Sequence, residues 1–526
     1  MIRRWTLRST IQPKHCIRGF ASSTRTMAMA RTYADAVASL NTLQSNFAIV
    51  DAIRKSGRKM NDQAIPEMIE WCRKIGYQPS DFDKINAIHI AGTKGKGSTA
   101  AFTSSILCQF IGQQSGERRL EKVGLYTSPH LRFVRERIQL NGEPLSEAQF
   151  AKYFFEVWDR LEKAAQDAGI DPSSPGTKPV YFRYLTLMAF HTYVSEGVDA
   201  AVIECGIGGQ YDSTNVIEAP TVTGITSLGI DHEAMLGSTI DQIAWHKAGI
   251  MKKGVKCFTT DSQLSDAKAV LEKVALERES PLVYVDVEPE IANGDIQLGL
   301  QAEFQKTNAS IAVSLAREWL VQKGVEVNKT RIRRGLEQVR WPGRCDTRRE
   351  PGLRWCIDGG HTLESIELSG KWFASELLSA STSTATTDHI QPRFLIFNQQ
   401  TRDAAALAKA LFKTLSTALN DQHPFTHAIF CTNTTFKETG FRPDLVSVNT
   451  NASDVEALKV QNNLAATWKS IDPAAEVHVV RTIEEAVDLV RGSVKQQGQG
   501  DEVTALVTGS LHLVGGFLEV LASTGE

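Results

Sequence analysis

The chain has 526 residues, of which 42% are hydrophobic and 22% are charged, and its formal net charge at pH 7 is −2. This length is enough for two to four domains with ordinary apolar cores, so the composition indicates a soluble globular protein. A nearly neutral chain gives no general case for nucleic-acid binding, and we expect no nucleic-acid partner.

The first 34 residues differ in composition from the rest of the chain. They contain six arginines, one lysine and no acidic residue, together with many serines and threonines. This composition is typical of a mitochondrial transit peptide, although a disordered basic arm would look similar. We therefore expect residues 1–34 to lie outside the fold and the protein to be mitochondrial, in the matrix or associated with the inner membrane. Initiation at Met27 or Met29 would give a cytosolic form.

Apolar strand-like runs alternate with helical patterns in the first two thirds of the chain. The predicted strands lie within residues 85–92, 123–127, 199–206 and 221–229, and the predicted helices cover 99–111 and 181–196. Such alternation indicates a parallel sheet with helices on both faces. Ligands of these sheets bind beyond the carboxyl ends of the strands.

A glycine-rich loop joins the first predicted strand to the helix that follows it. Its residues are Gly92, Thr93, Lys94, Gly95, Lys96, Gly97, Ser98 and Thr99. Glycines let backbone N–H groups approach an anion, Lys96 can reach the outer phosphates of a nucleotide, and Ser98 can offer its hydroxyl to Mg²⁺. The usual GxxxxGK[ST] pattern is broken by Gly97, and a plain strand-to-helix turn is the alternative. We favour a nucleotide site.

Polar residues follow two other strands of this series. Glu204 ends an apolar run before a glycine turn, where a nucleotide site needs an acid to hold magnesium. An ion-paired or capping glutamate is the alternative interpretation. Asp231 and His232 follow the strand at 221–229, and Lys247 lies in WHKAGI. Spacing alone assigns no specific role to these three residues.

A second alternating series begins after Trp341 and Pro342. Its predicted strands are RWCIDGG, RFLIFN, HAIFCT, EVHVVR and EVTALVTG, with helices such as 402–419 between them and an exposed loop at 379–388. The fold class is therefore α/β. We predict a P-loop-containing ATPase domain with a parallel sheet over 35–340, a linker over 341–350, and a smaller Rossmann-like domain over 351–526.

Two further patterns exclude other classes of protein. The eight cysteines are widely spaced without a CxxC pair, which favours buried reduced thiols over disulfides or zinc ligands. The most membrane-like segment, residues 505–518, is too short to span a bilayer and reads as a strand, a turn and a helix. We expect no integral membrane segment.

An ordered series of motifs resembles a known family. The series is GTKGKGS, LYTSPHL, RERI, IECGIGG, YDSTN, GIDHEAMLG, WHKAGI, FQKTNA, RWPGR, DGGHT and TGSL. From about residue 35 to its C-terminus the chain resembles the folylpolyglutamate synthases, within the Mur-type ATP-dependent amide ligases. YFRYLTLMAFH and YDSTN are more similar to the eukaryotic synthases than to the bacterial ones. Two departures, Lys256 and Gly360, remove no functional group.

The resemblance implies roles for the matching residues. Magnesium would be held by Ser98 and Glu204, and a second metal by His232, beside a carbamylated Lys247 that acts as an extra acid. Gln305, Asn308 and Arg344 would contact ATP together with the glycine-rich loop. Asp358 and His361 would lie near the nucleotide and the incoming amino acid, and they complete the catalytic set with Lys96 and Lys247. Candidates for the folate and glutamate side are Ser128, Pro129, His130, Arg137, His361 and Ser510.

The implied activity is that of an ATP-dependent ligase, a tetrahydrofolate:L-glutamate γ-ligase that forms ADP. The γ-carboxylate of a reduced folate would attack ATP, and the amine of glutamate would attack the resulting acyl phosphate. The expected cofactors are ATP, one or two Mg²⁺ ions and a monovalent cation such as K⁺, and the expected oligomeric state is a monomer. Two alternatives remain open: a dihydrofolate synthase that adds glutamate to dihydropteroate, and a nucleotide-gated ATPase or binding module.

Overall fold

The structure is a computed structural model of the whole chain. It describes residues 31–44, 62–115, 118–381, 391–400, 402–440, 443–445, 457–495 and 502–524. The chain divides into two units, Met1–Arg31 and Thr32–Glu526. The predicted transit peptide thus lies almost wholly outside the described residues.

The second unit begins with a capped helix, α1 (Tyr33–Asn41). The Thr32 hydroxyl accepts a hydrogen bond from Asp35 N at 3.3 Å, and the Asp35 carboxylate accepts one from Thr32 N at 2.7 Å. This reciprocal cap satisfies N–H groups that the helix itself cannot pair. Residues 33 and 34, which we expected to lie outside the fold, are therefore the first turn of α1.

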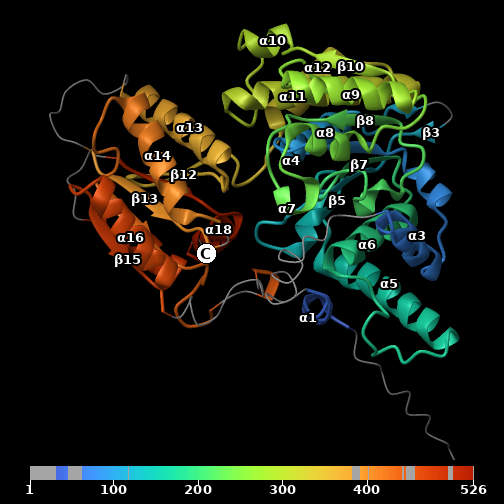
Figure 1. Ribbon diagram of the computed structural model, residues 1–526, viewed down its shortest axis with the longest axis horizontal. Coiled ribbons are helices and arrows are strands. Elements are labelled where there is room, and N and C mark those ends of the chain that lie inside the picture. The colour runs from blue at the N-terminus through green and yellow to red at the C-terminus, as the bar shows by residue number, and fades with distance from the viewer. Residues whose placement is uncertain are drawn as a thin grey trace, which may run out of the picture. The chain divides into compact units, whose positions relative to one another are not determined.

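The first sheet has eight strands in the order β10-β9-β8-β1-β7-β4-β5-β6 (Figure 1). Its strands are β1 (Ile88–Ala91), β4 (Val123–Tyr126), β5 (Ile138–Leu140), β6 (Glu143–Pro144), β7 (Ala200–Glu204), β8 (Val222–Ile225), β9 (Cys257–Thr260) and β10 (Leu282–Val285). Six strands are parallel, and β5 and β6 continue the sheet in antiparallel fashion. The four strands predicted from the sequence are the central neighbours β8, β1, β7 and β4.

Helices cover both faces of this sheet and enclose separate apolar cores. The helices of the first domain after α1 are α3 (Ala64–Lys74), α4 (Lys96–Cys108), α5 (Glu147–Asp167), α6 (Tyr181–Glu196), α7 (Glu233–Leu236), α8 (Ile240–Ala248), α9 (Ser265–Glu277), α10 (Pro289–Ala292), α11 (Glu303–Gln322) and α12 (Lys329–Gln338). One core joins the sheet to α5 and α6, and another joins it to α4, α11 and α12. Alternating strand residues serve the two cores, as the pleat requires: Ile203 faces the first and Val202 the second.

The second sheet has six strands in the order β11-β12-β16-β13-β14-β15. Its strands are β11 (Asp346–Glu350), β12 (Leu353–Ile357), β13 (Arg393–Phe397), β14 (His427–Phe430), β15 (Glu476–Val479) and β16 (Val503–Thr508). All but β11 run parallel. The α/β fold class is confirmed. Residues 346–350, which we predicted to be part of a linker, form the strand β11 instead, because they pair with β12 along its whole length.

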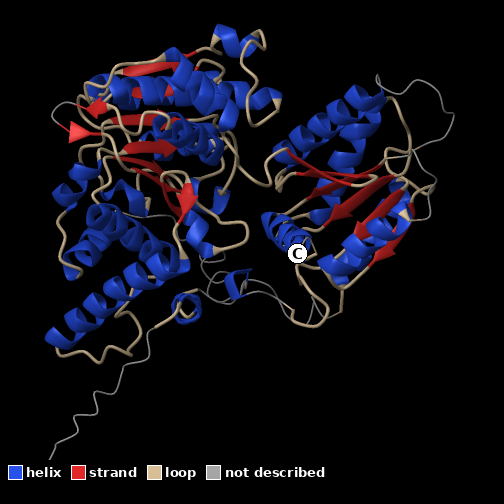
Figure 2. Ribbon diagram, turned by 180° about the vertical axis from the view of Figure 1, so that it is seen from behind, coloured by secondary structure: helices blue, strands red, loops and turns tan. Residues whose placement is uncertain are grey.

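Helices flank the second sheet on both faces, as Figure 2 shows. They are α13 (Leu363–Ser381), α14 (Ala404–Leu419), α16 (Lys459–Ile471), α17 (Ile483–Val494) and α18 (Leu511–Ser523). Cores form between the sheet and α13, α14 and α16, and between the sheet and α17 and α18. The segment 505–518 is β16, a turn and the start of α18, as predicted.

Small elements complete the described chain. They are β2 (Gln114–Ser115), β3 (Arg118–Arg119) and four 3₁₀ turns, η1 (Pro79–Ile85), η2 (Val134–Arg137), η3 (Ser213–Val216) and η4 (Pro443–Leu445). Among the residues that the structure describes, no helix combines the length and the hydropathy needed to cross a bilayer.

Candidate functional site

The glycine-rich loop runs from the end of β1 into α4, and its neighbours leave no room for side chains at two glycines. Gly92 has φ +148°, and a Cβ there would lie 1.9 Å from Thr226 Oγ1. Gly95 has φ +88°, and its Cβ would lie 2.1 Å from Asn308 Oδ1. Only glycine fits these positions, so the loop backbone packs directly against β8 and α11.

The loop is held so that the start of α4 is exposed to a ligand. The N–H groups of Thr93 and Lys94 donate to Ser227 O at 3.0 and 3.1 Å, which anchors the first half of the loop beyond β8. Helix α4 then begins at Lys96, and the first N–H groups of a helix have no partner within the helix. Together with the positive end of the helix dipole they form a site for an anion such as a phosphate.

Lys96 bends back over this loop. Its Nζ donates to Gly92 O at 3.0 Å and to Thr93 O at 3.5 Å. These are weak acceptors compared with a phosphate oxygen, so the ammonium is positioned to turn toward a nucleotide.

Gln305 and Asn308 reach the loop from α11. Gln305 Nε2 donates to Ser98 Oγ at 3.2 Å, and Asn308 Nδ2 donates to Gln305 Oε1 at 2.9 Å. All three side chains are buried. The structure therefore brings together two predicted nucleotide contacts and the hydroxyl predicted to bind magnesium.

Glu204 lies beside the same loop at the end of β7. Its side chain is buried, its Oε2 accepts a hydrogen bond from Ser128 N at 3.0 Å, and both carboxylate oxygens lie within 3.7 Å of where a Gly97 Cβ would stand. Burial raises the pKa of Glu204, while Lys96 and the Ser128 N–H oppose the shift. A buried carboxylate near the Ser98 hydroxyl supplies the hard oxygen donors that Mg²⁺ prefers, so these residues fit a magnesium site.

Asp212 positions Glu204, and we did not single it out from the sequence. Its Oδ2 accepts hydrogen bonds from Gly206 N and Ile207 N, each at 3.0 Å, and its Oδ1 accepts one from Thr214 N at 3.0 Å. The carboxylate thus fixes the glycine turn directly after Glu204. The only signal was its place in YDSTN, which carried the family resemblance without a stated role.

His232 and Lys247 lie next to the loop, and their surroundings disfavour a positive charge on either side chain. Lys247, on α8, is 2% exposed, and burial lowers its pKa to about 7, with the charge of Lys96 adding to the shift. His232 precedes α7, and burial, together with the nearby charges of Lys247 and Lys96, lowers its pKa to about 4. Each of these groups disfavours the charge of the others, and an anionic ligand would relieve that repulsion.

Asp231 joins the loop to the second domain, and the sequence did not predict this contact. Its Oδ2 accepts a hydrogen bond from Lys94 Nζ at 3.0 Å, and its Oδ1 accepts one from Arg402 at 3.1 Å. Burial would raise the pKa of Asp231, but the charges of Lys94, His232 and Arg402 hold it below its ordinary value. Asp231 was visible at a strand end, whereas no motif marks Arg402, two residues before α14.

Asp358, Arg344 and His361 meet at the end of β12. Asp358 Oδ1 accepts a hydrogen bond from Gly360 N at 2.9 Å, and Oδ2 accepts one from Cys345 N at 3.1 Å. Burial raises the pKa of Asp358 against the opposing charge of Arg344, which also acts on Glu204. His361 Nδ1 donates to Gly359 O at 2.9 Å, which leaves Nε2 as an acceptor, and burial lowers its pKa to about 4.

The residues proposed for the folate side form a second group, after β4. Ser128 contacts Glu204 as described, and a cis peptide bond joins it to Pro129. His130 Nδ1 accepts a hydrogen bond from Arg137 Nε at 2.9 Å, and its Nε2 donates to Asp444 O at 2.9 Å. This fixes one neutral tautomer, consistent with burial lowering the pKa of His130 to about 3.

Ser510 is placed differently from the rest of the predicted set. It caps α18, with its Oγ accepting a hydrogen bond from His512 N at 3.2 Å. The adjacent Gly509 N donates to Gly360 O at 3.1 Å, so TGSL and DGGHT touch through their backbones. In the structure Ser510 acts as a helix cap, and its contact with a substrate stays a prediction.

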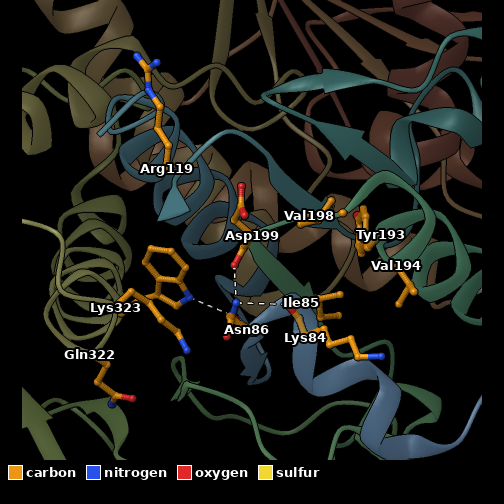
Figure 3. A pocket seen from close by; sticks show the side chains of 12 residues that line it. Lys84, Ile85, Asn86, Arg119, Tyr193, Val194, Val198, Asp199, Gln322 and Lys323 are labelled. Carbon is orange, nitrogen blue, oxygen red and sulfur yellow. Dashed lines mark hydrogen bonds between the residues drawn. The ribbon is translucent and has the colours of Figure 1, made fainter. Parts of the chain in front are cut away.

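A separate pocket lies at the amino ends of β1 and β7 and has a volume of about 600 Å³. Figure 3 shows Asn86 beside Asp199, and the Asn86 Nδ2 donates to Asp199 O at 2.9 Å. The Asn86 backbone O accepts a hydrogen bond from Trp319 Nε1 at 2.9 Å. Lys84 and Lys323 also line it. None of its lining residues is a predicted site residue, so we assign this pocket no part in the chemistry.

Known proteins resemble this chain over nearly its whole length. No protein-family model matches it. A folylpolyglutamate synthase of Neurospora crassa is 44% identical over 505 residues, which cover 94% of this chain and 93% of the relative. Another, of Saccharomyces cerevisiae (strain AWRI796), is 45% identical over 502 residues, covering 93% and 87%.

A solved structure shows the same fold. The folylpolyglutamate synthase of Mycobacterium tuberculosis, complexed with ADP and AMPPCP, matches with a TM-score of 0.63 at 23% identity, over 92% of this chain and 98% of that chain. The expected two-domain, Mur-type ligase fold is thereby confirmed. With two relatives this similar over this length, the chain belongs to the folylpolyglutamate synthase family.

Proposed function

We propose that this protein is an ATP-dependent ligase that adds glutamate to the γ-carboxylate of reduced folates. One observation carries the proposal: a glycine-rich phosphate loop, its lysine and a buried carboxylate meet at the carboxyl end of the first sheet, in a chain 44–45% identical to folylpolyglutamate synthases.

The reaction would proceed in two displacements. A γ-carboxylate oxygen of the folate attacks the γ-phosphorus of ATP, which releases ADP and leaves an acyl phosphate. The neutral amine of glutamate then attacks the acyl carbon, an amide bond forms, phosphate leaves, and the nitrogen gives up a proton. Each step moves charge onto phosphate oxygens, so the chain must supply fixed positive groups.

The residues around the loop can supply them. The N–H groups at the start of α4 bind the phosphates, Lys96 turns from Gly92 O to the transferred phosphoryl group, and Arg344 approaches from the second domain. Ser98 and Glu204 would hold a magnesium ion, which would neutralise phosphate charge. Holding both reactants in place is worth up to about 7–11 kcal/mol in effective-molarity terms.

Lys247 would act as its carbamate. Its buried amine has a pKa of about 7, so a large fraction is neutral at physiological pH and can add CO₂. Addition of CO₂ to the neutral amine joins nitrogen to carbon and releases one proton, so the amine becomes an oxygen anion beside His232. That anion would serve a second metal, as magnesium prefers oxygen ligands. A monovalent cation such as K⁺ would be a further cofactor.

The proposal also covers the cellular location and the oligomeric state of the protein. The basic, acid-free composition of residues 1–34 supports import into mitochondria, with Met27 or Met29 as starts of a cytosolic form. We propose that the enzyme works as a monomer, since the loop, Ser128 and Glu204 come together within a single copy of the chain.

The deciding experiment offers two acceptors in parallel. Purified protein receives ATP, Mg²⁺ and labelled glutamate with either tetrahydrofolate or dihydropteroate, and ADP and ligated product are both measured. We expect one ADP per glutamate joined, with tetrahydrofolate as the acceptor. Product from dihydropteroate alone would identify a dihydrofolate synthase, and ADP without product would identify a nucleotide-gated ATPase.

Two lysine variants complete that experiment. Lys96→Ala should lower the ligation rate by about 10²–10³-fold, the usual cost of removing one preorganised charge from a transferring group. Lys84→Ala is the matched control, because its side chain is 73% exposed at the opposite end of the strands, where it pairs with Asp81. Equal loss in both variants would contradict the role of Lys96.

A further inference from the structure

Three potential metal ligands meet at the edge of the second sheet, near the amino ends of its strands β14 and β15. They are His427, the first residue of β14, and Glu476 and His478 on β15. His427 pairs with Glu476 in the parallel register, and His478 lies two residues further on the same strand. Because side chains alternate between faces, all three project from one face of the sheet.

Their ligand atoms are already close enough to share an ion. His427 Nε2 lies 3.5 Å from one Glu476 oxygen, and His478 Nε2 lies 3.3 Å from the other. The three ligand atoms all fall within 4.8 Å of one another. Bonds of about 2.0–2.1 Å in a tetrahedral zinc site put neighbouring ligand atoms roughly 3.3 Å apart. Small side-chain rotations would therefore complete the coordination.

A hydroxyl behind His427 fixes which ring nitrogen faces the carboxylate. Thr426 Oγ1 donates to Arg393 O at 2.9 Å and lies 2.8 Å from His427 Nδ1. This contact occupies Nδ1, and Nε2 is the ring nitrogen that faces Glu476. A hydrogen-bonded far nitrogen of this kind is the usual support of a metal-binding histidine.

Ring stacking fixes the plane of the same imidazole. Phe394, on β13, stacks on His427 with 4.2 Å between ring centroids and 11° between planes. The His478 ring lies parallel to that of His427, with 6.0 Å between centroids and 9° between planes. The two ligand rings thus face the carboxylate in matching orientation before any ion binds.

The cluster is half-buried but can still be reached from solvent. The histidine side chains are only 26% and 25% exposed and Glu476 is 66% exposed, so an ion can enter and keep a water ligand.

We propose that His427, Glu476 and His478 bind one divalent transition-metal ion of the zinc class and so fasten the edge strand β15 to β14. Two imidazoles with one carboxylate suit Zn²⁺ or Co²⁺, whereas Mg²⁺ prefers an all-oxygen shell. The site is distinct from the ATP site, which lies at the carboxyl ends of the strands.

The test uses the full-length protein, stripped of transition metals by a chelator and kept in excess Mg²⁺. Zn²⁺ binding is measured by calorimetry, Co²⁺ binding by its visible absorption, and melting temperature with and without Zn²⁺. We expect a single site whose Zn²⁺ affinity falls at least about tenfold in His478→Gln and in Glu476→Gln, and a zinc-dependent rise in melting temperature that both variants lose.

A matched control and a conservative variant make the outcome decisive. His423→Gln removes a histidine that pairs with one carboxylate, Asp472, at 2.8 Å, and it should leave zinc binding unchanged. His478→Cys keeps a metal donor and should keep binding, which covers the case that His478→Gln fails to fold. Equal zinc affinity in the wild type and His478→Gln, or no zinc binding by the wild type, would overturn the proposal.

Discussion

Lys247 lies in an environment that conflicts with its ordinary charge. It is 2% exposed, and burial and Lys96 together lower its pKa to about 7. In the part of the chain that the structure describes, no carboxylate is hydrogen-bonded to its Nζ. The proposed carbamylation would reverse the sign of the charge and remove this conflict.

Lys247→Ala should reduce ligation to about 10⁻²–10⁻³ of the wild-type rate, because it removes one fixed anion from a water-excluded site. Formate or acetate should restore part of the activity, since either can replace the carbamate oxygens, and methylamine should not. Rescue by methylamine alone would show that the amine itself is the working group.

The wild-type enzyme should also respond to bicarbonate in a pH-dependent way. Only the neutral amine adds CO₂, and its fraction rises as pH increases through the folded pKa of about 7. We expect CO₂-free buffer to reduce activity most clearly below pH 7, and added bicarbonate to restore it. Activity that does not change with bicarbonate at any pH, together with electron density for an unmodified lysine, would exclude the carbamate.

At the scale of elements, the connection from β1 to α4 depends on glycine for two separate reasons. Gly95→Ala would strain a backbone at φ +88° and would place a Cβ 2.1 Å from Asn308 Oδ1. We expect kcat/KM for ATP to fall by about 10²-fold, because displacement near 1 Å at a positioning group has costs of that size.

Gly76→Ala separates the two effects. Gly76 has nearly the same φ, +89°, and a Cβ there would have no atom within 4 Å. It should cost only the backbone strain, about 1–2 kcal/mol in the free energy of unfolding, and leave kcat/KM unchanged. If both variants lose the same activity, the contact with Asn308 does not position the nucleotide.

The sequence predicted the elements that are long or deeply buried. The central strands β8, β1, β7 and β4 were found because their apolar runs are continuous, and helix α6 was found with both of its ends. β10 was missed because it lies at the edge of the sheet and is only partly buried, and its neighbour β9 was missed because CFTT has only two apolar residues. β11 was missed because its residues, DTRRE, are charged and lie on an edge.

Site residues were predicted from the sequence where they belong to a recognisable motif. They were missed where their place depends on a contact between residues that are far apart in the sequence. Ser98, Gln305 and Asn308 come together as expected. Arg402 reaches Asp231 across 171 positions of sequence, and no local pattern encodes such a contact. Asp212 was overlooked because it accepts hydrogen bonds from backbone N–H groups. Any acidic residue in a loop can do this, so its sequence context gives no specific signal.

On the scale of the whole molecule, the segment after β4 ties the two α/β domains together. Arg132 pairs with Glu519 of α18 at 2.6 Å, and a Cβ on Gly515 would lie 2.0 Å from Leu131 O. His130 lies between these contacts and Arg137. A folate bound at this segment would therefore touch both domains, which suits a site that excludes water.

The N-terminus should be separable from the working enzyme. A chain that starts at Met29 keeps Thr32 and the cap of α1, so it retains the contacts of the second unit described above. We expect it to have full ligase activity in vitro and to stay outside mitochondria in cells, whereas import is the expected result for the full-length chain. A halving of purified activity would show that residues 1–28 belong to the catalytic protein.

The shared carboxylate of Asp231 has a consequence for the order of substrate uptake. It pairs with Lys94 of the phosphate loop and with Arg402 of the second domain. Because the two cations repel each other, each ion pair weakens the other. Phosphates that draw Lys94 away leave the whole carboxylate to Arg402 and so strengthen its hold. Reciprocity then requires that a substrate which keeps Arg402 on Asp231 also tightens ATP binding. ATP and any substrate that holds Arg402 on Asp231 would thus each increase the affinity of the enzyme for the other.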